Sequence, residues 1–258
     1  MTDALLVLED IHTYYGEAHI LQGISLTVRQ GEVVTIIGRN GAGKTTTLRS
    51  IMGIAQPRRG RIFLRGQDVT GFPTHQIARN GIAWVPEERR ILPNLTVLDN
   101  LRLGWLATSR ESADAVSPKG ESDTRMGDAR GPFRGPRVEE VFEYFPRLCE
   151  RIAHRGRHLS GGEQQMLAIA RALVARPSIM LVDEPTEGLA PMLVQSLTEI
   201  LAAINRRGTT ILLVEQALEV ALTLAHRVYV MDQGRIQFEG TPDDLRRDPE
   251  IQQRFLGV

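Results

Sequence analysis

The sequence has little cysteine, no long apolar run and no excess of charge of either sign. Its single cysteine, Cys149, excludes an internal disulfide and suits a reducing compartment. No stretch approaches the length of about 18 apolar residues that crosses a membrane. The first residues lack the basic and then apolar pattern of a secretion signal. We therefore expect neither a membrane-spanning nor a secreted protein.

The charges balance, because 31 lysine and arginine residues stand against 31 aspartate and glutamate residues. This balance argues against a nucleic-acid partner bound through bulk charge. The chain has 258 residues, of which 42% are hydrophobic and 24% charged, which is close to an ordinary globular composition. Such a length allows one large domain or two small ones.

Apolar segments bounded by turn residues predict strands in the first third of the chain, at 5–8, 24–28, 32–37, 61–64 and 82–85. Helical patterns are expected at 44–52, 97–105 and 138–145. The last hundred residues alternate helices with strands, at 162–175, 179–182, 191–205, 210–214, 218–225 and 228–231. This alternation predicts an α/β fold with a parallel sheet and crossover helices.

The segment 109–137 differs from the rest of the chain. It is rich in glycine, proline, serine and charged residues, and it holds few large apolar side chains. Such a segment cannot bury enough surface to offset its ordering entropy. We predict a flexible surface insertion, and a solvated loop without function is favoured over a partner-binding segment.

A glycine-rich loop follows the predicted strand 32–37 and precedes a predicted helix. Residues Gly38–Thr45 match G-x-x-x-x-G-K-[ST], which in this context predicts a phosphate-binding loop rather than a chance turn. Its glycines let backbone N–H groups approach phosphate oxygens, and the helix N-terminus favours negative charge. Lys44 would reach the β- and γ-phosphates, and Thr45 would ligate Mg²⁺.

Two acidic residues end a second buried strand. Asp183 and Glu184 follow the apolar run 179–182. Asp183 would hold Mg²⁺ directly or through water, and Glu184 would be the base that polarises the attacking water. Many strands end in an acid, so the phosphate loop upstream is what makes this interpretation strong.

The sequence Leu-Ser-Gly-Gly-Glu-Gln at 159–164 opens a predicted helix. Ser160 and Glu163 have the spacing of a capping box, and a well-capped helix is the simpler interpretation. Gly161 and Gly162, however, leave bare N–H groups that suit a second anion-binding surface. One chain cannot easily place this surface on its own γ-phosphate, so we expect a head-to-tail dimer.

These three motifs, in this order and spacing, resemble the ATP-binding subunit of ABC transporters. The resemblance covers the chain except for 109–137. It implies a single ABC ATPase domain over 1–258, with a P-loop NTPase parallel-sheet core, an N-terminal antiparallel β subdomain and an α-helical subdomain at 87–160. It also implies ATP and Mg²⁺ as cofactors, and a dimer docked on membrane-spanning permease subunits at the cytoplasmic face of the membrane.

The resemblance assigns further roles residue by residue. Tyr15 matches the aromatic residue that stacks on adenine, with Tyr14 as the alternative. Further contacts with the phosphates are expected from the loop residues Gly38, Asn40, Gly41, Ala42, Gly43 and Thr46. Contacts made in trans with the nucleotide of the other subunit are expected from Ser160, Gly161, Gly162 and Glu163.

The chain departs from the family pattern at two positions of the expected site. Glu87 stands where most members have glutamine; it could ligate Mg²⁺ but, if ionised, could not donate to the lytic water. Gln216 stands where most have histidine, and it offers the γ-phosphate only a neutral hydrogen bond. Our hypothesis is that ATP hydrolysis remains possible because Glu184 is present, and that a partner subunit adjusts its rate.

Three further stretches, 85–90, 187–191 and 214–216, together resemble the LivF-type branch of branched-chain amino acid importers. This branch implies a second, LivG-like ATPase, or a second copy, as the dimer partner. It also implies a periplasmic or extracellular solute-binding protein as an indirect partner. The alternatives are an importer of urea, amides or another polar solute, a non-transport ABC ATPase, and a P-loop small-molecule kinase.

Overall fold

The computed structural model describes residues 4–106 and 136–257. The predicted insertion at 109–137 lies outside them, apart from its last two residues. The chain divides into two compact units, one of Met1–Glu88 with Pro177–Val258 and one of Arg89–Arg176. In the described part of the chain, no helix is long and apolar enough to span a membrane. The bounds of 87–160 for a helical subdomain stay a prediction.

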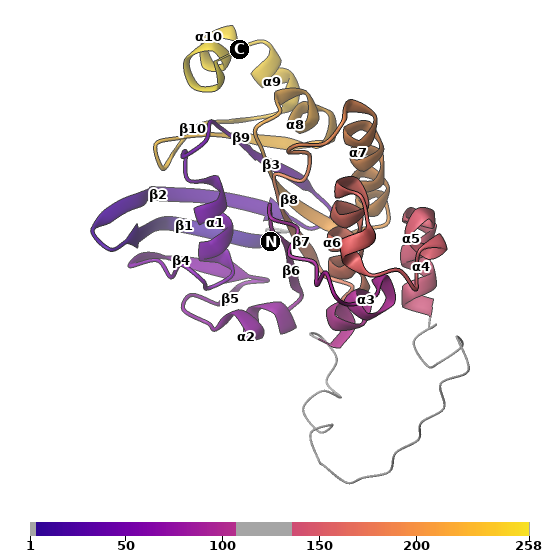
Figure 1. Ribbon diagram of the computed structural model, residues 1–258. Coiled ribbons are helices and arrows are strands. Elements are labelled where there is room, and N and C mark those ends of the chain that lie inside the picture. Colours follow the sequence, from indigo (N-terminus) through magenta and orange to yellow (C-terminus); the bar gives the residue numbers. More distant parts are fainter. Residues whose placement is uncertain (1–3, 107–135, 258) are drawn as a thin grey trace. The chain divides into compact units, whose positions relative to one another are not determined.

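The first unit begins with an antiparallel sheet (Figure 1). Its strand order is β2-β1-β4-β5, and the strands are β1 (Ala4–Tyr15), β2 (Ala18–Arg29), β4 (Arg59–Leu64) and β5 (Gln67–Asp68). β1 and β2 are much longer than the fragments predicted at 5–8 and 24–28. Register shifts between Leu8 and Ile11 and at other points of this hairpin interrupt the two-residue alternation, so local pattern reveals only part of each strand.

The second sheet has the order β10-β9-β3-β8-β7-β6. Its strands are β3 (Val33–Ile37), β6 (Ile82–Val85), β7 (Ile179–Asp183), β8 (Thr210–Glu215), β9 (Arg227–Asp232) and β10 (Arg235–Gly240). The five strands from β9 to β6 are parallel, which confirms the predicted parallel sheet. β10 was not predicted: it pairs antiparallel with β9 across a turn in which Gln233 and Gly234 both have positive φ.

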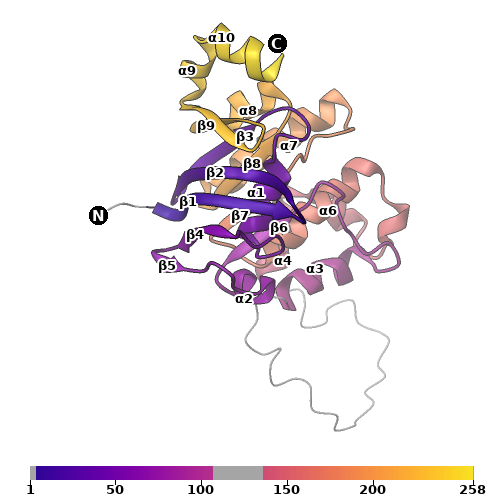
Figure 2. The ribbon, with the colours of Figure 1, turned by 90° about the vertical axis from the view of Figure 1, so that its left-hand side faces the viewer.

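The helices of the first unit contact the strands of both sheets. They are α1 (Lys44–Ile51), α2 (Thr74–Arg79), α7 (Pro191–Arg206), α8 (Leu218–Leu224), α9 (Pro242–Arg246), α10 (Pro249–Ile251) and a final π-helical turn η3 (Gln252–Leu256). α1 packs against β2 and β7, and α8 packs against β3 and β8. α9 and α10 lie at the β9–β10 end of the sheet (Figure 2).

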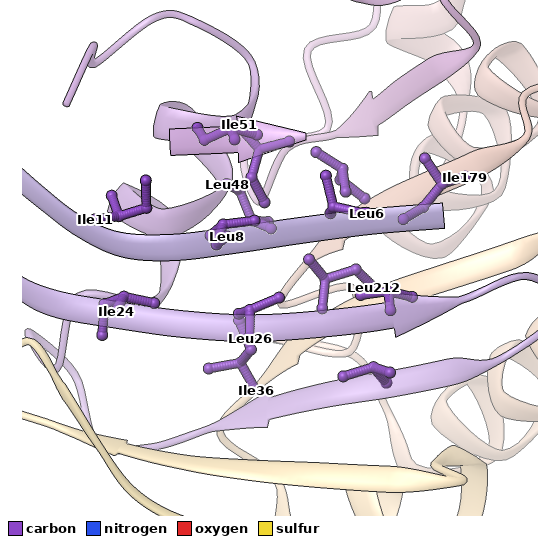
Figure 3. Close-up of a cluster of buried hydrophobic side chains, with 14 of the residues drawn as sticks. Leu6, Leu8, Ile11, Ile24, Leu26, Ile36, Leu48, Ile51, Ile179 and Leu212 are labelled. Atoms are coloured by element: carbon purple, nitrogen blue, oxygen red, sulfur yellow. The ribbon is translucent and has the colours of Figure 1, made fainter. Parts of the chain in front are cut away.

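One hydrophobic core joins the two sheets and α1. Leu6 and Leu8 of β1 and Leu48 and Ile51 of α1 belong to a single buried cluster that reaches Leu212 of β8 (Figure 3). Every residue of β3, β7 and β8 is buried, so these strands show continuous apolar runs instead of alternation.

The described residues of the second unit are mainly helical, with one isolated antiparallel bridge between Thr96 and Arg155. They form α3 (Val97–Leu106), α4 (Pro136–Tyr144), α5 (Pro146–Glu150), a short 3₁₀ turn η2 (Gly156–His158) and α6 (Gly161–Val174). α6 contacts the other three α-helices. At the crossing of α3 and α6, a Cβ added to Gly104 would lie 2.0 Å from the carbonyl oxygen of Arg171, so only glycine permits this approach.

We expect Leu212→Ala to lower the free energy of unfolding by about 2–5 kcal/mol, because it leaves a cavity among fully buried side chains. Met192→Ala is the control, since Met192 is 84% exposed, and it should change stability by less than about 0.5 kcal/mol. Chemical denaturation followed by circular dichroism measures both. Equal effects of the two variants would contradict this account of the core.

Candidate active site

Three neighbouring parallel strands end at one edge of the second sheet. β8 lies between β3 and β7, with Ile37 opposite Glu215 and Asp183 opposite Val214. The phosphate loop, Glu184 and Gln216 therefore leave the sheet side by side, although they are far apart in sequence. Loops at the carboxyl ends of parallel strands are the usual place for a ligand in α/β folds.

The phosphate loop depends on glycine at two positions. A Cβ added to Gly38 would lie 2.2 Å from the carbonyl oxygen of Met231, a distance that no side chain allows. Gly43 precedes α1 with φ of 110°, a conformation that other residues rarely adopt. Gly234 fixes the loop further, because its N–H donates to the carbonyl oxygen of Ala42 at 2.8 Å. The loop is thus held against the turn between β9 and β10.

A pocket of about 400 Å³ opens beside this loop. Among the predicted residues, its lining contains Tyr15, Asn40, Gly41, Gly43, Lys44, Thr45, Thr46, Glu87 and Glu184. Two lining residues, Ile20 and Glu187, were not predicted. Gly38 and Ala42 do not line the pocket, and the Ala42 side chain is buried beneath the loop.

Lys44 and Glu184 form an almost fully buried ion pair in the pocket wall. Lys44 Nζ lies 3.0 Å from Glu184 Oε1. The same ammonium donates to the carbonyl oxygens of Gly38 at 2.8 Å and Arg39 at 3.2 Å. These contacts satisfy all three ammonium protons and hold the charge at the mouth of the loop.

Glu184 is in the left-handed region, with φ of 41°. Its N–H donates to the carbonyl oxygen of Val214 at 2.9 Å, which fixes the residue against β8. A non-glycine residue in this conformation costs free energy, and such strain clusters at functional positions. Here it turns the Glu184 carboxylate into the pocket, towards Lys44.

Asp183 is 1% exposed and lies beneath the pocket. Thr45 Oγ1 donates to its Oδ1 at 3.0 Å, whereas its Oδ2 is buried without a hydrogen-bond partner. Burial raises the pKa of Asp183 to about 6; the bond from Thr45 opposes this shift, and the charges of Glu184 and Glu87 reinforce it. An unsatisfied carboxylate oxygen beside a hydroxyl is a donor set that fits a hard divalent cation.

Glu87 adds a third oxygen donor to the pocket wall. Burial raises its pKa, and a hydrogen bond with Glu187 and the charges of Glu187, Glu184 and Glu88 raise it further. Within residues 4–106 and 136–257, no three histidine, cysteine or acidic side chains are grouped so as to hold a metal by themselves. A small donor set suits Mg²⁺, which commonly takes one or two carboxylates together with substrate phosphates and waters.

Comparison with known proteins identifies the family. The model described as "ABC transporter" matches residues 21–187, more than half of the chain. The chain belongs to the ABC transporter family. Members of this family hydrolyse ATP, so the chain is an ABC-type ATPase, as the three motifs predicted.

Individual ABC proteins are similar over almost the whole chain. The branched-chain amino acid transport ATP-binding protein BraG of Pseudomonas aeruginosa is 40% identical, covering 98% of this chain and all of that protein. The probable LivF of Archaeoglobus fulgidus is 31% identical, covering 95% of each. The lipopolysaccharide export protein LptB of Haemophilus influenzae is also 31% identical, covering 98% of each. The predicted resemblance to the ATPases of branched-chain amino acid importers is confirmed.

A solved ABC structure agrees with the fold. The dimeric post-hydrolysis state of an ATP-binding cassette bound to ADP and phosphate has a TM-score of 0.76 and 26% identity, covering 92% of this chain and 98% of that one. The predicted ABC fold, with its parallel core, antiparallel β subdomain and helical part, is confirmed.

The aromatic candidate of this ABC ATPase lies at the pocket rim. Tyr15 is 44% exposed, and its hydroxyl accepts from Arg49 Nη1 at 3.4 Å. Tyr14 does not line the pocket: its ring stacks on His19 at 4.2 Å, with the Arg58 guanidinium 4.5 Å from the ring centroid. Of the two tyrosines, only Tyr15 has its ring available to a ligand in the pocket.

The predicted capping box at the start of α6 is confirmed. The N–H of Glu163 donates to Ser160 Oγ at 3.3 Å, and the N–H of Ser160 donates to Glu163 Oε2 at 2.8 Å. Ser160, Gly161, Gly162 and Glu163 belong to the second unit and are not among the residues that line the pocket. Their expected contact with a nucleotide in trans stays a prediction.

Gln216 does not line the pocket, and its local structure centres on an acid that sequence analysis missed. The preceding residue, Glu215, is 2% exposed, and its carboxylate accepts from the backbone N–H of Gln216 at 3.1 Å. Burial raises the pKa of Glu215, and hydrogen bonds from Thr186, Ala217 and Gln216 oppose the shift. The one signal in the sequence was an acid that ends an apolar strand.

We expect Asp183→Asn to stabilise the nucleotide-free protein at neutral pH. Because the pKa of Asp183 is about 6 when folded and 3.8 ordinarily, ionisation favours the unfolded chain and the folded state loses stability as pH rises through this interval. Replacement should gain up to about 3 kcal/mol at pH 7. The gain should shrink as pH falls from 7 towards 4 and vanish only below pH 4, where both states bind the proton.

Denaturant titrations at several pH values measure this difference. The matched control is Asp243→Asn at an exposed position of α9, for which we expect little change at any pH. A stabilisation by Asp183→Asn that is the same at pH 4 and pH 7 would show that ionisation of Asp183 is not its cause.

Proposed function

We propose that the chain is the ATP-binding and ATP-hydrolysing subunit of an ABC importer that powers the uptake of branched-chain amino acids through separate membrane subunits. The observation that carries this proposal is the 40% identity to BraG over 98% of the chain. The pocket supports it, because a phosphate loop, an ammonium and a carboxylate base converge there.

The first unit would bind one face of the nucleotide. N–H groups of the loop and the Lys44 ammonium would bind the phosphates, and the Tyr15 ring would stack on adenine. Thr45 and Asp183, with Glu87 beside them, would hold Mg²⁺. When bound, the cation supplies positive charge that neutralises the phosphate oxygens.

The pairing of Lys44 with Glu184 suggests how binding prepares the base. A phosphate oxygen that accepts from Lys44 Nζ competes with Glu184 Oε1, which lies only 3.0 Å away. When the Lys44 ammonium pairs with the phosphate instead of with Glu184, the Glu184 carboxylate becomes free to accept a proton from water. Gln216 would donate a neutral hydrogen bond to the γ-phosphate.

A second ATPase would complete the site. Ser160, Gly161, Gly162 and Glu163 would contact the nucleotide held by a LivG-like subunit or by a second copy of this chain. The dimeric ATP-binding cassette that the chain resembles supports this arrangement. The assembly would lie at the cytoplasmic face of the membrane on permease subunits, with a solute-binding protein as an indirect partner.

A different cargo is the second candidate. LptB is as similar to the chain as LivF is, at 31% identity, so overall similarity at that level does not separate cargoes. The pocket is proposed to bind ATP, so its lining does not bear on the choice of cargo. Urea, amides or another polar solute would leave the proposed chemistry of ATP unchanged.

We expect Glu184→Gln to lower the rate of ATP hydrolysis by at least about 100-fold, because it removes the general base. ATP binding should remain, since the amide leaves Lys44 available to the phosphates. Radiolabelled phosphate release and equilibrium binding of a fluorescent ATP analogue measure the two effects. Glu199→Gln, at an exposed position of α7, is the matched control and should behave as the unmodified chain. Hydrolysis by Glu184→Gln at the full rate would refute this role.

We expect the tagged chain, purified from its own membranes, to bring with it a second ATPase, two membrane subunits and an amino-acid-type binding protein. Mass spectrometry of the bound proteins tests this. Membrane subunits without a second ATPase would indicate a homodimer and would reopen the question of the cargo. Recovery of a monomer without partners would contradict the proposed assembly.

A further inference from the structure

Glu215 connects two loops of the site through one carboxylate. Its Oε1 accepts from Thr186, from the hydroxyl at 2.8 Å and from the backbone N–H at 3.4 Å. Its Oε2 accepts from the backbone N–H groups of Gln216 at 3.1 Å and Ala217 at 3.3 Å. Each oxygen of this buried group therefore binds a different loop.

The four bonds use the whole hydrogen-bonding capacity of the carboxylate. An ionised carboxylate has about four acceptor positions and no donor. All four groups that it meets here are neutral donors, so an ionised Glu215 satisfies every one of them. A buried acid with this donor set is costly to replace, because each lost acceptor leaves a polar group unsatisfied.

The two loops carry the groups on which hydrolysis is proposed to depend. Thr186 is two residues beyond Glu184, and the next residue, Glu187, lines the pocket. The other loop begins with Gln216. A second bond, from the N–H of Glu184 to the carbonyl oxygen of Val214, joins the same two chain segments two residues before Thr186 and one before Glu215.

We propose that Glu215 is a positioning residue of the ATPase reaction, fastening the loop 184–187 to Gln216 and Ala217 so that the two loops keep one relative geometry. This inference rests on the proposed roles of Glu184 and Gln216. Glu215 itself does not line the pocket and acts through these neighbours.

A carboxylate accepts from all four of these donors, which an amide cannot do. In Glu215→Gln a single oxygen remains, and the NH₂ group that replaces the other oxygen is a donor. If the oxygen faces Thr186, the NH₂ group meets the N–H groups of Gln216 and Ala217. If the side chain flips, the NH₂ group can donate to the Thr186 hydroxyl, but the backbone N–H of Thr186 loses its acceptor. Either orientation therefore leaves at least one backbone N–H of the two loops without its acceptor and weakens the connection.

Thr186→Val tests the connection from the other side. It removes the hydroxyl that binds Oε1 and leaves Glu215 in place, whereas Thr186→Ser keeps a hydroxyl there. Thr223→Val is the matched control, since it removes a hydroxyl that donates to the Glu219 carbonyl oxygen within α8. This control should change neither loop.

The first measurement is amide hydrogen exchange of the nucleotide-free, full-length chain by mass spectrometry. We expect Thr186→Val to speed exchange at 216–217, on the other loop, by about tenfold, because local opening becomes easier. Thr186→Ser should restore most of the protection. Faster exchange confined to 184–187 would overturn the proposal, because the carboxylate would then not connect the loops.

The second measurement is ATP hydrolysis by the complex isolated with its partners. We expect Thr186→Val and Glu215→Gln to lower kcat by about tenfold, with KM for ATP changed less than twofold, because the phosphate loop is untouched. Thr186→Ser should recover most of kcat. Unchanged kcat in Thr186→Val would overturn the positioning role even if Glu215→Gln failed to fold.

The outcome for Glu184→Gln separates the two proposals. If that variant hydrolyses ATP normally, the proposed function fails, while hydrogen exchange still decides whether Glu215 fastens the loops. If it is inactive and Thr186→Val keeps its full kcat, only the positioning role fails.

Discussion

β3, β8 and β7 are hydrogen-bonded side by side in parallel, and every residue along them is buried. Because parallel neighbours end at the same edge, the register of these three strands determines where the phosphate loop, Asp183 and Glu215 lie relative to one another. The rigid packing of these strands positions polar groups that come from three distant parts of the sequence. α1 continues directly from the phosphate loop and packs into the same core, so the helix that would face a phosphate is fixed by apolar contacts.

The polar edge of this sheet holds ionisable groups away from water, although charged groups are more stable when hydrated. Asp183 and Glu215 are buried acids with raised pKa values, and Lys44 and Glu184 form a buried pair. The free energy needed to remove two charges from water offsets much of the free energy gained from their attraction. The apolar strands beneath supply the stability that keeps these groups in place. Function and stability therefore oppose each other most strongly within a few residues of the strand ends.

Local patterns in the sequence predicted the groups that lie next to one another in the chain. Spacing and apolar runs were enough to predict four features: the phosphate loop, the pair Asp183 and Glu184, the cap at Ser160 and the parallel strands. The full length of β1 was not apparent, because bulges break its alternation. Ile20 and Glu215 were missed for another reason: their roles depend on contacts with residues that are remote in sequence, which no local pattern records.

The contact between the phosphate loop and the β9–β10 turn bears on the thermodynamics of ligand binding. Gly38 packs on the Met231 carbonyl, and Gly234 bonds to Ala42, so the loop holds its curved shape through contacts with a hairpin almost 200 residues downstream. A loop ordered in advance loses little conformational entropy when it closes on an anion, and more of the contact energy remains as affinity. We therefore expect the β9–β10 hairpin to influence nucleotide affinity through the shape in which it holds the loop.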